Sequence, residues 1–240
     1  MIILYLDIET TYEWRDYNDM PQHGKDSFKR KFQNDAAVKK MMEGGITGIT
    51  LDAALEKHYY EVAALYAEFS RVVCIGIGAV MLNKEDNTPY IFARCLSGSE
   101  LEIFSQFNTI LEKIKPDMLC AHNGKRFDFG FLSRRMMIHG FQIPEIMRST
   151  GIKPWDLRLI DTVELWKFTD NSYYVSLVTL AFVFGVESPK QDIEGHQVPL
   201  AFFRGEIERI KTYCIGDVIC LIHVHRAMTY EPRIEVIKIV

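Results

Sequence analysis

The chain has 240 residues, of which 48% are hydrophobic and 25% are charged, and its formal net charge is −4. This composition is typical of a globular protein with a sizeable core and excludes a fibre or a disordered chain. Because the balance is acidic, the overall field does not attract polyanions, so any affinity for nucleic acid has to come from a local patch or from bound metal ions.

The cysteines and the N-terminal run indicate a cytoplasmic protein without membrane association. Five cysteines are scattered along the chain with no Cys-x-x-Cys pair, which favours reduced, buried thiols over a disulfide framework or a zinc site. The N-terminal apolar run has no basic segment before it and is interrupted by Asp7 and Glu9. It is therefore too short for a signal peptide or a membrane span.

The first predicted element is a buried strand over residues 2–10 that ends in two acids. Side chains two residues apart on a strand share a face, about 6.6 Å from each other. Leu6 and Ile8 then point one way, and Asp7 and Glu9 point the other way. Two acids on one face of a buried strand are costly unless a cation lies between them, which suggests a divalent metal. Taken alone, the motif favours a strand that has simply reached solvent, and only further acids reverse that interpretation.

Residues 12–70 are interpreted as a charged insertion between the first two strands. Apolar residues are sparse up to residue 43, glycines follow at 44, 45 and 48, and helices are expected over 27–42 and 52–69. Basic residues gather in the first part of this segment: Lys25, Lys29, Arg30, Lys31, Lys39 and Lys40. This basic cluster is either a solvated helix face or a grip for nucleic acid.

The rest of the chain predicts a mixed sheet covered by helices. Strands over 72–82 and 90–96, joined by a polar turn, form a hairpin that extends the first strand in an antiparallel arrangement. The remaining expected elements are helix 97–115, strand 117–122, helix 127–139, strand 157–162, helix 175–184 and helix 207–228. We therefore expect one α/β domain over residues 1–240, antiparallel in its first part and flanked by helices.

A third acid, Asp128, follows the turn at residues 123–127 and falls in the first turn of a helix. The helix dipole favours an acid at that position in any protein, which is the purely structural interpretation. The functional interpretation requires Asp128 to lie at the same sheet edge as Asp7 and Glu9. A turn from strand to helix does place it at the carboxyl end of a strand, where α/β proteins gather their ligand groups.

A fourth acid, Asp217, lies four residues after Tyr213 in the final helix, so the two side chains share one face. That face borders an apolar stripe of Ile210, Cys214, Val218 and Leu221. We expect Asp217 to point into the protein, where a carboxylate needs a partner. A structural hydrogen bond between the tyrosine and the acid would also explain the pair. Asp161, at the end of a strand, is a further acid for which we expect a structural role.

These motifs, in this order, resemble the exonuclease motifs of the DEDD superfamily, the RNase H-like 3′–5′ exonucleases of the DnaQ type. The motifs are Asp7-x-Glu9, Asn123-x-x-x-Phe127-Asp128 and Tyr213-x-x-x-Asp217, with Ser188-Pro189-Lys190 as a supporting feature. Tyr213 matches the DEDDy branch, because the DEDDh branch would have histidine where this chain has Thr212. Over residues 2–228 the chain is similar to the predicted exonucleases related to the exonuclease domain of family B DNA polymerases.

The resemblance implies an RNase H-like fold and a metal-dependent 3′–5′ exonuclease that releases nucleoside 5′-monophosphates from single-stranded DNA or RNA 3′ ends. Two Mg²⁺ or Mn²⁺ ions would be held by Asp7, Glu9, Asp128 and Asp217, with Asp7 shared between them. Tyr213 would orient the attacking water, since its ordinary pKa near 10 makes it a poor base.

Four residues near these motifs are candidate contacts to nucleic acid: Thr10, Asn123, Lys125 and Phe127. For each, a turn, a core or a solvated position is the structural alternative. A catalytically silent RNase H-like module that binds nucleic acid or protein is the main rival for the whole chain. A second rival is another metal-dependent phosphohydrolase acting on nucleotides. Proofreading would require a polymerase partner in trans, because these residues contain no polymerase domain.

Overall fold

The structure is a computed structural model of the chain, and it describes residues 1–43, 49–170, 172–188 and 192–240. The strands are β1 (Ile3–Tyr12), β2 (Ser70–Leu82), β3 (Pro89–Ser97), β4 (Met118–Ala121), β5 (Leu159–Asp161) and β6 (Ile237–Ile239). The helices are α1 (Gln22–Phe32), α2 (Ala36–Glu43), α3 (Leu51–Val62), α4 (Glu100–Ile114), α5 (Asp128–Ile138), α6 (Thr162–Lys167), α7 (Leu177–Phe184), α8 (Val198–Phe203) and α9 (Ile207–Met228). Short 3-10 turns, among them Tyr17–Asp19 and Ala63–Leu65, connect some of these elements.

One sheet with the strand order β5-β4-β1-β2-β3-β6 forms the centre of the described structure. β1 pairs antiparallel with β2, and β2 with β3, whereas β4 runs parallel to β1 and β5 runs parallel to β4. The carboxyl ends of the parallel strands β1, β4 and β5 therefore meet at one edge of the sheet. This mixed sheet with an antiparallel first part is the architecture that the sequence predicts.

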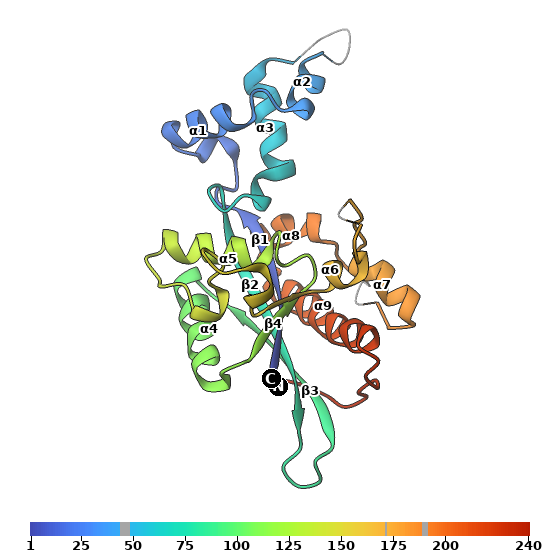
Figure 1. Ribbon diagram of the computed structural model, residues 1–240. Coiled ribbons are helices and arrows are strands. Elements are labelled where there is room, and N and C mark those ends of the chain that lie inside the picture. Colours follow the sequence, from blue (N-terminus) through green and yellow to red (C-terminus); the bar gives the residue numbers. More distant parts are fainter. Residues whose placement is uncertain (44–48, 171, 189–191) are drawn as a thin grey trace.

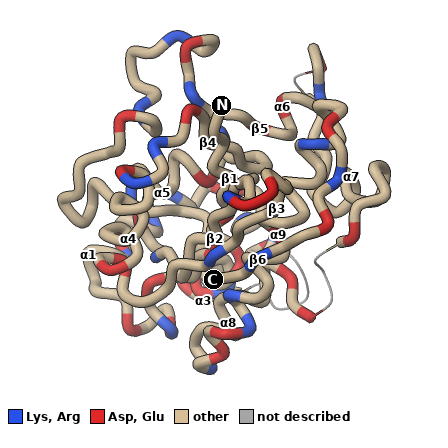
Figure 2. Tube along the Cα trace, turned by 90° about the horizontal axis from the view of Figure 1, so that it is seen from below, with Lys and Arg blue, Asp and Glu red and all other residues tan. Residues whose placement is uncertain are grey.

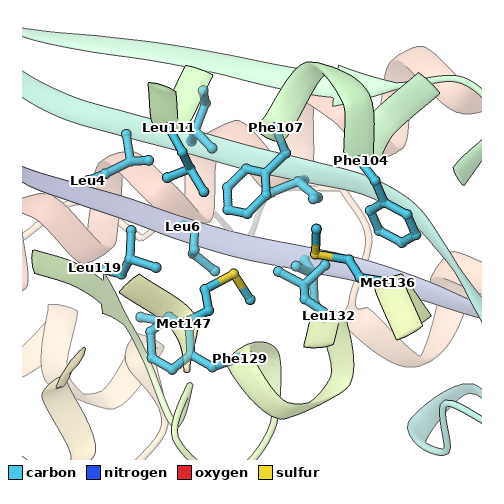
Figure 3. Packing of buried hydrophobic residues seen from close by; sticks show 14 of the residues in the cluster. Leu4, Leu6, Phe104, Phe107, Leu111, Leu119, Phe129, Leu132, Met136 and Met147 are labelled. Carbon is cyan, nitrogen blue, oxygen red and sulfur yellow. The ribbon is translucent and has the colours of Figure 1, made fainter. Parts of the chain in front are cut away.

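The two faces of β1 meet different surroundings. Leu4, Leu6 and Ile8 belong to the largest hydrophobic cluster. Figure 3 shows Leu4 and Leu6 among side chains of α4 and α5. Each large apolar side chain buried in this way contributes roughly 1.5–3 kcal/mol relative to an exposed position. Helix α9 packs on the opposite face, across β1, β2 and β3, so the sheet lies between α4 and α5 on one side and α9 on the other (Figure 1).

Two glycines of β2 allow α9 to approach the sheet closely. A Cβ atom on Gly76 would lie 2.8 Å from Cys214 Sγ, and one on Gly78 would lie 2.7 Å from Val218 Cγ1. Both distances are too short for real contacts, so any side chain at these positions would push the helix outward. The glycines thus set how near α9 comes to β1.

Helices α1 to α3 form a lobe beyond the end of the sheet, between β1 and β2 (Figure 1). The lobe has its own buried cluster: Tyr17, Met20, Phe28, Phe32, Val38, Ala54, Leu55, Tyr59, Ala63 and Phe69. A few large aromatic side chains are enough to fill this small core, although apolar residues are sparse up to residue 43.

Several element boundaries differ from those expected. The single helix expected over 27–42 is two helices, α1 and α2, and the helix expected over 52–69 ends at Val62 and continues as a 3-10 turn. Helices α6 and α8 and strand β6 were not anticipated because each is very short. Gly44, Gly45 and Gly48, and also Pro189 and Lys190, lie outside the described residues. Within the described residues, no helix has the length and apolar content that a membrane span requires.

Candidate metal and nucleic-acid site

The four acids singled out in the sequence line one cleft of about 890 Å³. Asp7 and Glu9 come from β1, Asp128 from the first turn of α5, and Asp217 from the middle of α9. Glu9, Asp128 and Asp217 are 7%, 4% and 9% exposed, and Asp7 is half-buried. Residues more than 200 positions apart in the chain thus present carboxylates to the same space.

The short length of β4 explains how Asp128 reaches β1. β4 pairs with β1 only from Ile3 to Tyr5 and ends at Ala121. Further along β1, the backbone N–H of Ile8 donates to the Asp128 carboxylate. The backbone N–H of Asp128 itself adds a second hydrogen bond to the same carboxylate. The acid therefore takes the place of a strand partner and is fixed beside Asp7 and Glu9.

A register shift between Glu9 and Thr10 marks the end of the acidic part of β1. Up to that point Asp7 lies opposite Gly76, and Glu9 lies opposite Cys74, on the face of the sheet that α9 covers. Irregularities of this kind increase the local twist and re-aim side chains, and they are frequent next to functional sites.

Tyr213 and Asp217 face β1 because α9 packs on the sheet through the apolar stripe between them. Ile210, Cys214, Val218 and Leu221 are all almost completely buried. Tyr213 forms a hydrogen bond with the Asp217 carboxylate. The four-residue spacing therefore places both groups in the cleft, as the helical periodicity predicts.

The electrostatics of the cleft favour a cation. Burial raises the pKa of Asp7 well above its usual value, and the charges of Glu9, Asp217 and Asp128 raise it further. Burial and the neighbouring acids do the same to Glu9. The pKa of Asp128 is raised to about 7, mainly by burial, although its two backbone hydrogen bonds oppose the shift. Ionising the whole cluster is therefore unfavourable, and a bound cation would offset this cost.

Among the described residues that line the cleft, none is a lysine or an arginine. His122 lines it, but burial lowers the pKa of its imidazole, so the ring is neutral near pH 7. The nearest possible ligand atoms of Asp7, Glu9 and Cys214 all lie within 4.8 Å of one another. A set of carboxylate oxygens fits Mg²⁺ or Mn²⁺, which prefer oxygen ligands.

Three of the four candidate nucleic-acid contacts line the cleft: Thr10, Asn123 and Phe127. The Thr10 hydroxyl donates to the carbonyl of Ala64 at 2.8 Å, which ties β1 to the end of the lobe. Asn123 has a left-handed φ of 60°, which a turn favours at asparagine. The fourth candidate, Lys125, does not line the cleft, and its ammonium pairs with Glu164 at 2.6 Å.

The basic cluster of the lobe is partly neutralised within the lobe. Lys29 pairs with Asp52 at 3.4 Å and Lys31 with Glu68 at 3.2 Å. The ammonium of Lys31 also lies 4.2 Å from the centre of the Tyr66 ring. Two of the six basic residues thus have acidic partners within the lobe.

Asp161 organises the turn that carries Asn123. Its carboxylate accepts hydrogen bonds from the backbone N–H groups of Asn123, Lys125 and Val163, at 2.9, 3.0 and 2.9 Å. Asp161 therefore holds the end of β4 against the end of β5 and caps α6. This is the structural role that we expected for it.

Several cleft residues were not identified from the sequence: Tyr60, Glu61, Leu65, His122, Tyr174, His196 and Pro199. Tyr60, Glu61 and Leu65 come from the lobe, and no local pattern marks them as cleft residues. His122 directly precedes Asn123 at the end of β4, and its ring nitrogens contact Thr162 Oγ1 at 2.8 Å and Val175 O at 3.0 Å. Its position at a strand end was a usable signal.

The fold and the site define a class of protein, a helix-flanked mixed sheet with an acidic cluster at the carboxyl ends of its central strands. Residues 65–230 match the family of predicted 3′-5′ exonucleases related to the exonuclease domain of PolB. The chain belongs to this family, which confirms the resemblance and the enzyme class predicted from the sequence. The matched residues include Asp128, Tyr213 and Asp217, whereas β1 with Asp7 and Glu9 precedes them.

Distant similarity to archaeal polymerases agrees with this assignment. The chain is 23% identical over 204 residues to a DNA polymerase of Pyrococcus glycovorans, covering 75% of this chain and 26% of that protein. A DNA polymerase of Thermococcus hydrothermalis is 23% identical over 212 residues, covering 75% and 12%. The chain thus spans 26% and 12% of the length of these two curated relatives.

The fold is also found in a solved polymerase. The family B DNA polymerase of the hyperthermophilic archaeon Pyrobaculum calidifontis matches 92% of this chain and 24% of its own, with a TM-score of 0.53 and 15% identity. This similarity confirms the predicted fold class.

Proposed function

We propose that the protein hydrolyses phosphodiester bonds at single-stranded 3′ ends with two divalent metal ions and releases nucleoside 5′-monophosphates. The observation that carries this proposal is the convergence of four acids from three elements in one cleft. A silent binding module has no need for carboxylates that raise one another's pKa. Asp7, Glu9, Asp128 and Asp217 are the proposed metal ligands, with Asp7 shared.

The bound ions would activate water and neutralise charge on the attacking and leaving oxygens. Tyr213 would then position the water by hydrogen bonding and would not remove its proton. Burial and the charges of Asp217, Glu9 and Asp7 raise the pKa of Tyr213 above its ordinary value. A phenol held protonated at neutral pH is a hydrogen-bond donor or acceptor, which suits an orienting role.

The rest of the cleft suits an unstacked strand end. Aromatic side chains from three regions line it: Tyr60, Phe127 and Tyr174. Bases of single strands stack on such rings, which gives affinity with little sequence preference. Thr10 and Asn123 are the proposed polar contacts to the terminal nucleotide, and Lys125 is a less direct candidate because it is paired with Glu164.

Affinity for the phosphate backbone should be modest. The formal net charge is −4, and segments of both signs are interspersed along the chain in the view of Figure 2. Few phosphate contacts imply a shallow dependence of binding on salt. We also propose that residues 12–70 are an insertion in a single domain, and that the protein is cytoplasmic, which its five free cysteines support.

The proposal is tested with a single-stranded oligonucleotide labelled at either end, in Mn²⁺ or in EDTA. We expect shortening from the 3′ end only with metal, and loss of shortening in Asp7→Asn. Glu85→Gln, in the exposed turn between β2 and β3, is the matched control and should retain full activity.

Three outcomes would contradict the proposal. Binding of the oligonucleotide without cleavage favours the silent module, and release of product from nucleotides but not from oligonucleotides favours a different phosphohydrolase. Unchanged cleavage by folded Asp7→Asn would reject the assignment of Asp7 as the shared ligand.

A further inference from the structure

Three of the five cysteines come together behind the acidic cluster, although they are far apart in the sequence. Cys74 lies in β2, Cys95 in β3 and Cys214 in α9. Their Sγ atoms all lie within 4.8 Å of one another. Tetrahedral coordination with metal–sulfur bonds of about 2.3 Å separates the sulfurs by about 3.8 Å. Small side-chain rotations would therefore bring the three sulfurs around one ion.

The strand register argues for a metal site over a disulfide between the two strand cysteines. Cys74 lies opposite Ser97, and Cys95 lies opposite Gly76, so the two cysteines share a face as diagonal neighbours. Diagonal neighbours have Cα atoms about 7–8 Å apart, whereas disulfides usually span about 4.4–6.8 Å. The two thiols thus converge on a common point from backbones that are too widely spaced to be bridged without movement.

The surroundings give the cluster a route to solvent. Gly76, directly opposite Cys95, has no side chain, which lets α9 bring Cys214 Sγ close to the sheet. Cys74 and Cys214 are fully buried, whereas Cys95 is half-buried and opens the cluster toward solvent. A site with three protein ligands and an accessible fourth position is a familiar arrangement for zinc.

The cluster also touches the acidic site through one side chain. Cys214 Sγ lies 3.6 Å from the main-chain oxygen of Asp7 and 3.7 Å from Asp7 Oδ2, as a donor to both. Thiolates select soft ions, and carboxylates select Mg²⁺ or Mn²⁺. Cys214 therefore belongs to the thiol cluster, which prefers soft ions, and also contacts Asp7 of the acidic cluster, which prefers Mg²⁺ or Mn²⁺.

We propose that Cys74, Cys95 and Cys214 form a thiolate site for a soft divalent ion of the zinc and cadmium class, whose occupancy lowers nuclease activity through Cys214 and Asp7. Binding exchanges up to three thiol protons for the ion and transfers no electrons. Asp7 then no longer accepts a hydrogen bond from the Cys214 thiol and instead lies next to the metal-bound Cys214 thiolate. The binding site stands by itself, whereas the effect on activity rests on the proposed function.

Cadmium is the probe, because sulfur-to-cadmium charge transfer gives an ultraviolet absorption band that needs no enzyme activity. The full chain is titrated with Cd²⁺ in excess Mg²⁺. We expect a band that saturates at one equivalent. Cys95→Ser should lose the band or bind at least about 100-fold more weakly, since even the loss of an outer partner costs 10–100-fold. Cys74→Ser should behave in the same way.

Two control variants separate this site from its alternatives. Cys220→Ser, a buried cysteine of α9 outside the cluster, should keep the band. Asp7→Asn should also keep it. Loss of the band in Asp7→Asn would overturn the proposal in favour of a mixed site made of Asp7, Glu9 and Cys214. Absence of any band in wild type would overturn it outright. Cys95 is half-buried, so an unchanged melting temperature of metal-free Cys95→Ser is the folding control.

The effect on activity is measured with stoichiometric Zn²⁺ in excess Mg²⁺. We expect wild type to be inhibited, and Cys95→Ser to keep its activity with Mg²⁺ alone and to lose the inhibition. Equal inhibition of both proteins would reject the link between the sites. Absence of all Mg²⁺-dependent cleavage, with the cadmium band intact, would reject the proposed function and leave the thiolate site in place.

Discussion

The two faces of β1 have opposite chemistry. Leu4, Leu6 and Ile8 are packed among apolar side chains, so burial of this face stabilises the fold. On the other face Asp7 and Glu9 lie beside Asp128 and Asp217, and burial raises the free energy of their ionised forms. The apolar face of β1 therefore stabilises the fold. The carboxylates on its other face repel one another, and a bound cation can relieve this repulsion.

Removing an acid from the acidic face should have the largest effect, and it should be on activity. Glu9→Gln is expected to lower the cleavage rate at least about 10³-fold, about 4 kcal/mol of transition-state stabilisation. Because it removes a repelling charge, its melting temperature in EDTA should be equal to or higher than that of wild type. Cleavage kinetics and thermal unfolding measure the two effects. If Glu9→Gln lost much stability but kept its activity per folded molecule, the contrast between the two faces of β1 would be wrong.

The matched change on the apolar face is Leu6→Ala. Leu6 is fully buried, and truncating such a leucine costs about 2–5 kcal/mol of unfolding free energy. Urea unfolding should show this loss, whereas the folded fraction should retain cleavage within a few-fold of wild type. If Leu6→Ala were as inactive as Glu9→Gln at full folding, the two faces would not be functionally separate.

The acidic face also predicts how stability depends on pH. The pKa of Asp128 is about 7 in the folded protein against about 3.9 in an unfolded chain. The native state then binds more protons than the unfolded state, so the free energy of unfolding falls as pH rises. This contribution is fully present below about pH 4 and is lost through about pH 7.

In EDTA, wild type should lose about 2–3 kcal/mol of unfolding free energy between pH 5 and pH 8 relative to Asp128→Asn, which lacks this titrating group. Denaturant unfolding at each pH measures this difference. Mg²⁺ or Mn²⁺ should remove most of it, because the ions stabilise the ionised cluster. Parallel profiles of unfolding free energy against pH for the two proteins in EDTA would show that the pKa of Asp128 is not raised in the folded protein.

The position of α9 over the acidic face can be tested through Gly76. Gly76→Ala would place a Cβ 2.8 Å from Cys214 Sγ and 3.1 Å from the Cys214 main-chain oxygen. The helix must shift, so we expect a loss of about 1–3 kcal/mol in stability together with reduced activity, because Asp217 moves with the helix. Urea unfolding and cleavage assays measure both.

Gly130→Ala is the control for Gly76→Ala. Its Cβ would meet only the flexible side chain of Arg134, at 3.4 Å. It lies inside α5, where alanine is favoured over glycine by about 1 kcal/mol. Stability should therefore rise or stay constant, with unchanged cleavage. If Gly76→Ala and Gly130→Ala changed stability and cleavage equally, Gly76 would not be what sets the position of α9.

The smallest effect is expected at Tyr213. Tyr213→Phe removes the hydroxyl that we propose to orient water and leaves the four acids in place, so we expect a decrease in kcat of about 10-fold, or 1.4 kcal/mol. KM should change little. A loss as large as that of Glu9→Gln would mean that the tyrosine does more than orient the water.

The predictions from the sequence differed in accuracy for physical reasons. The strands and long helices followed from periodicity, as in β1 and α9, because alternation and helical spacing are local properties. The lobe was less well predicted, since its core depends on pairings such as Phe28 with Tyr59 and Phe32 with His58, which join residues from separate helices.

By itself, the sequence determined which residues are candidates for the chemistry and which face of its own element each one occupies. Asp7 and Glu9 had to share a face of a strand, and Tyr213 and Asp217 had to share a face of a helix, because backbone geometry fixes both periods. Three features were decided only by the tertiary structure. β4 ends early, so the Ile8 N–H is available to bind Asp128; Gly76 and Gly78 let α9 approach the sheet; and Cys74, Cys95 and Cys214 meet. Each of these depends on contacts between elements distant in sequence, which no local pattern encodes.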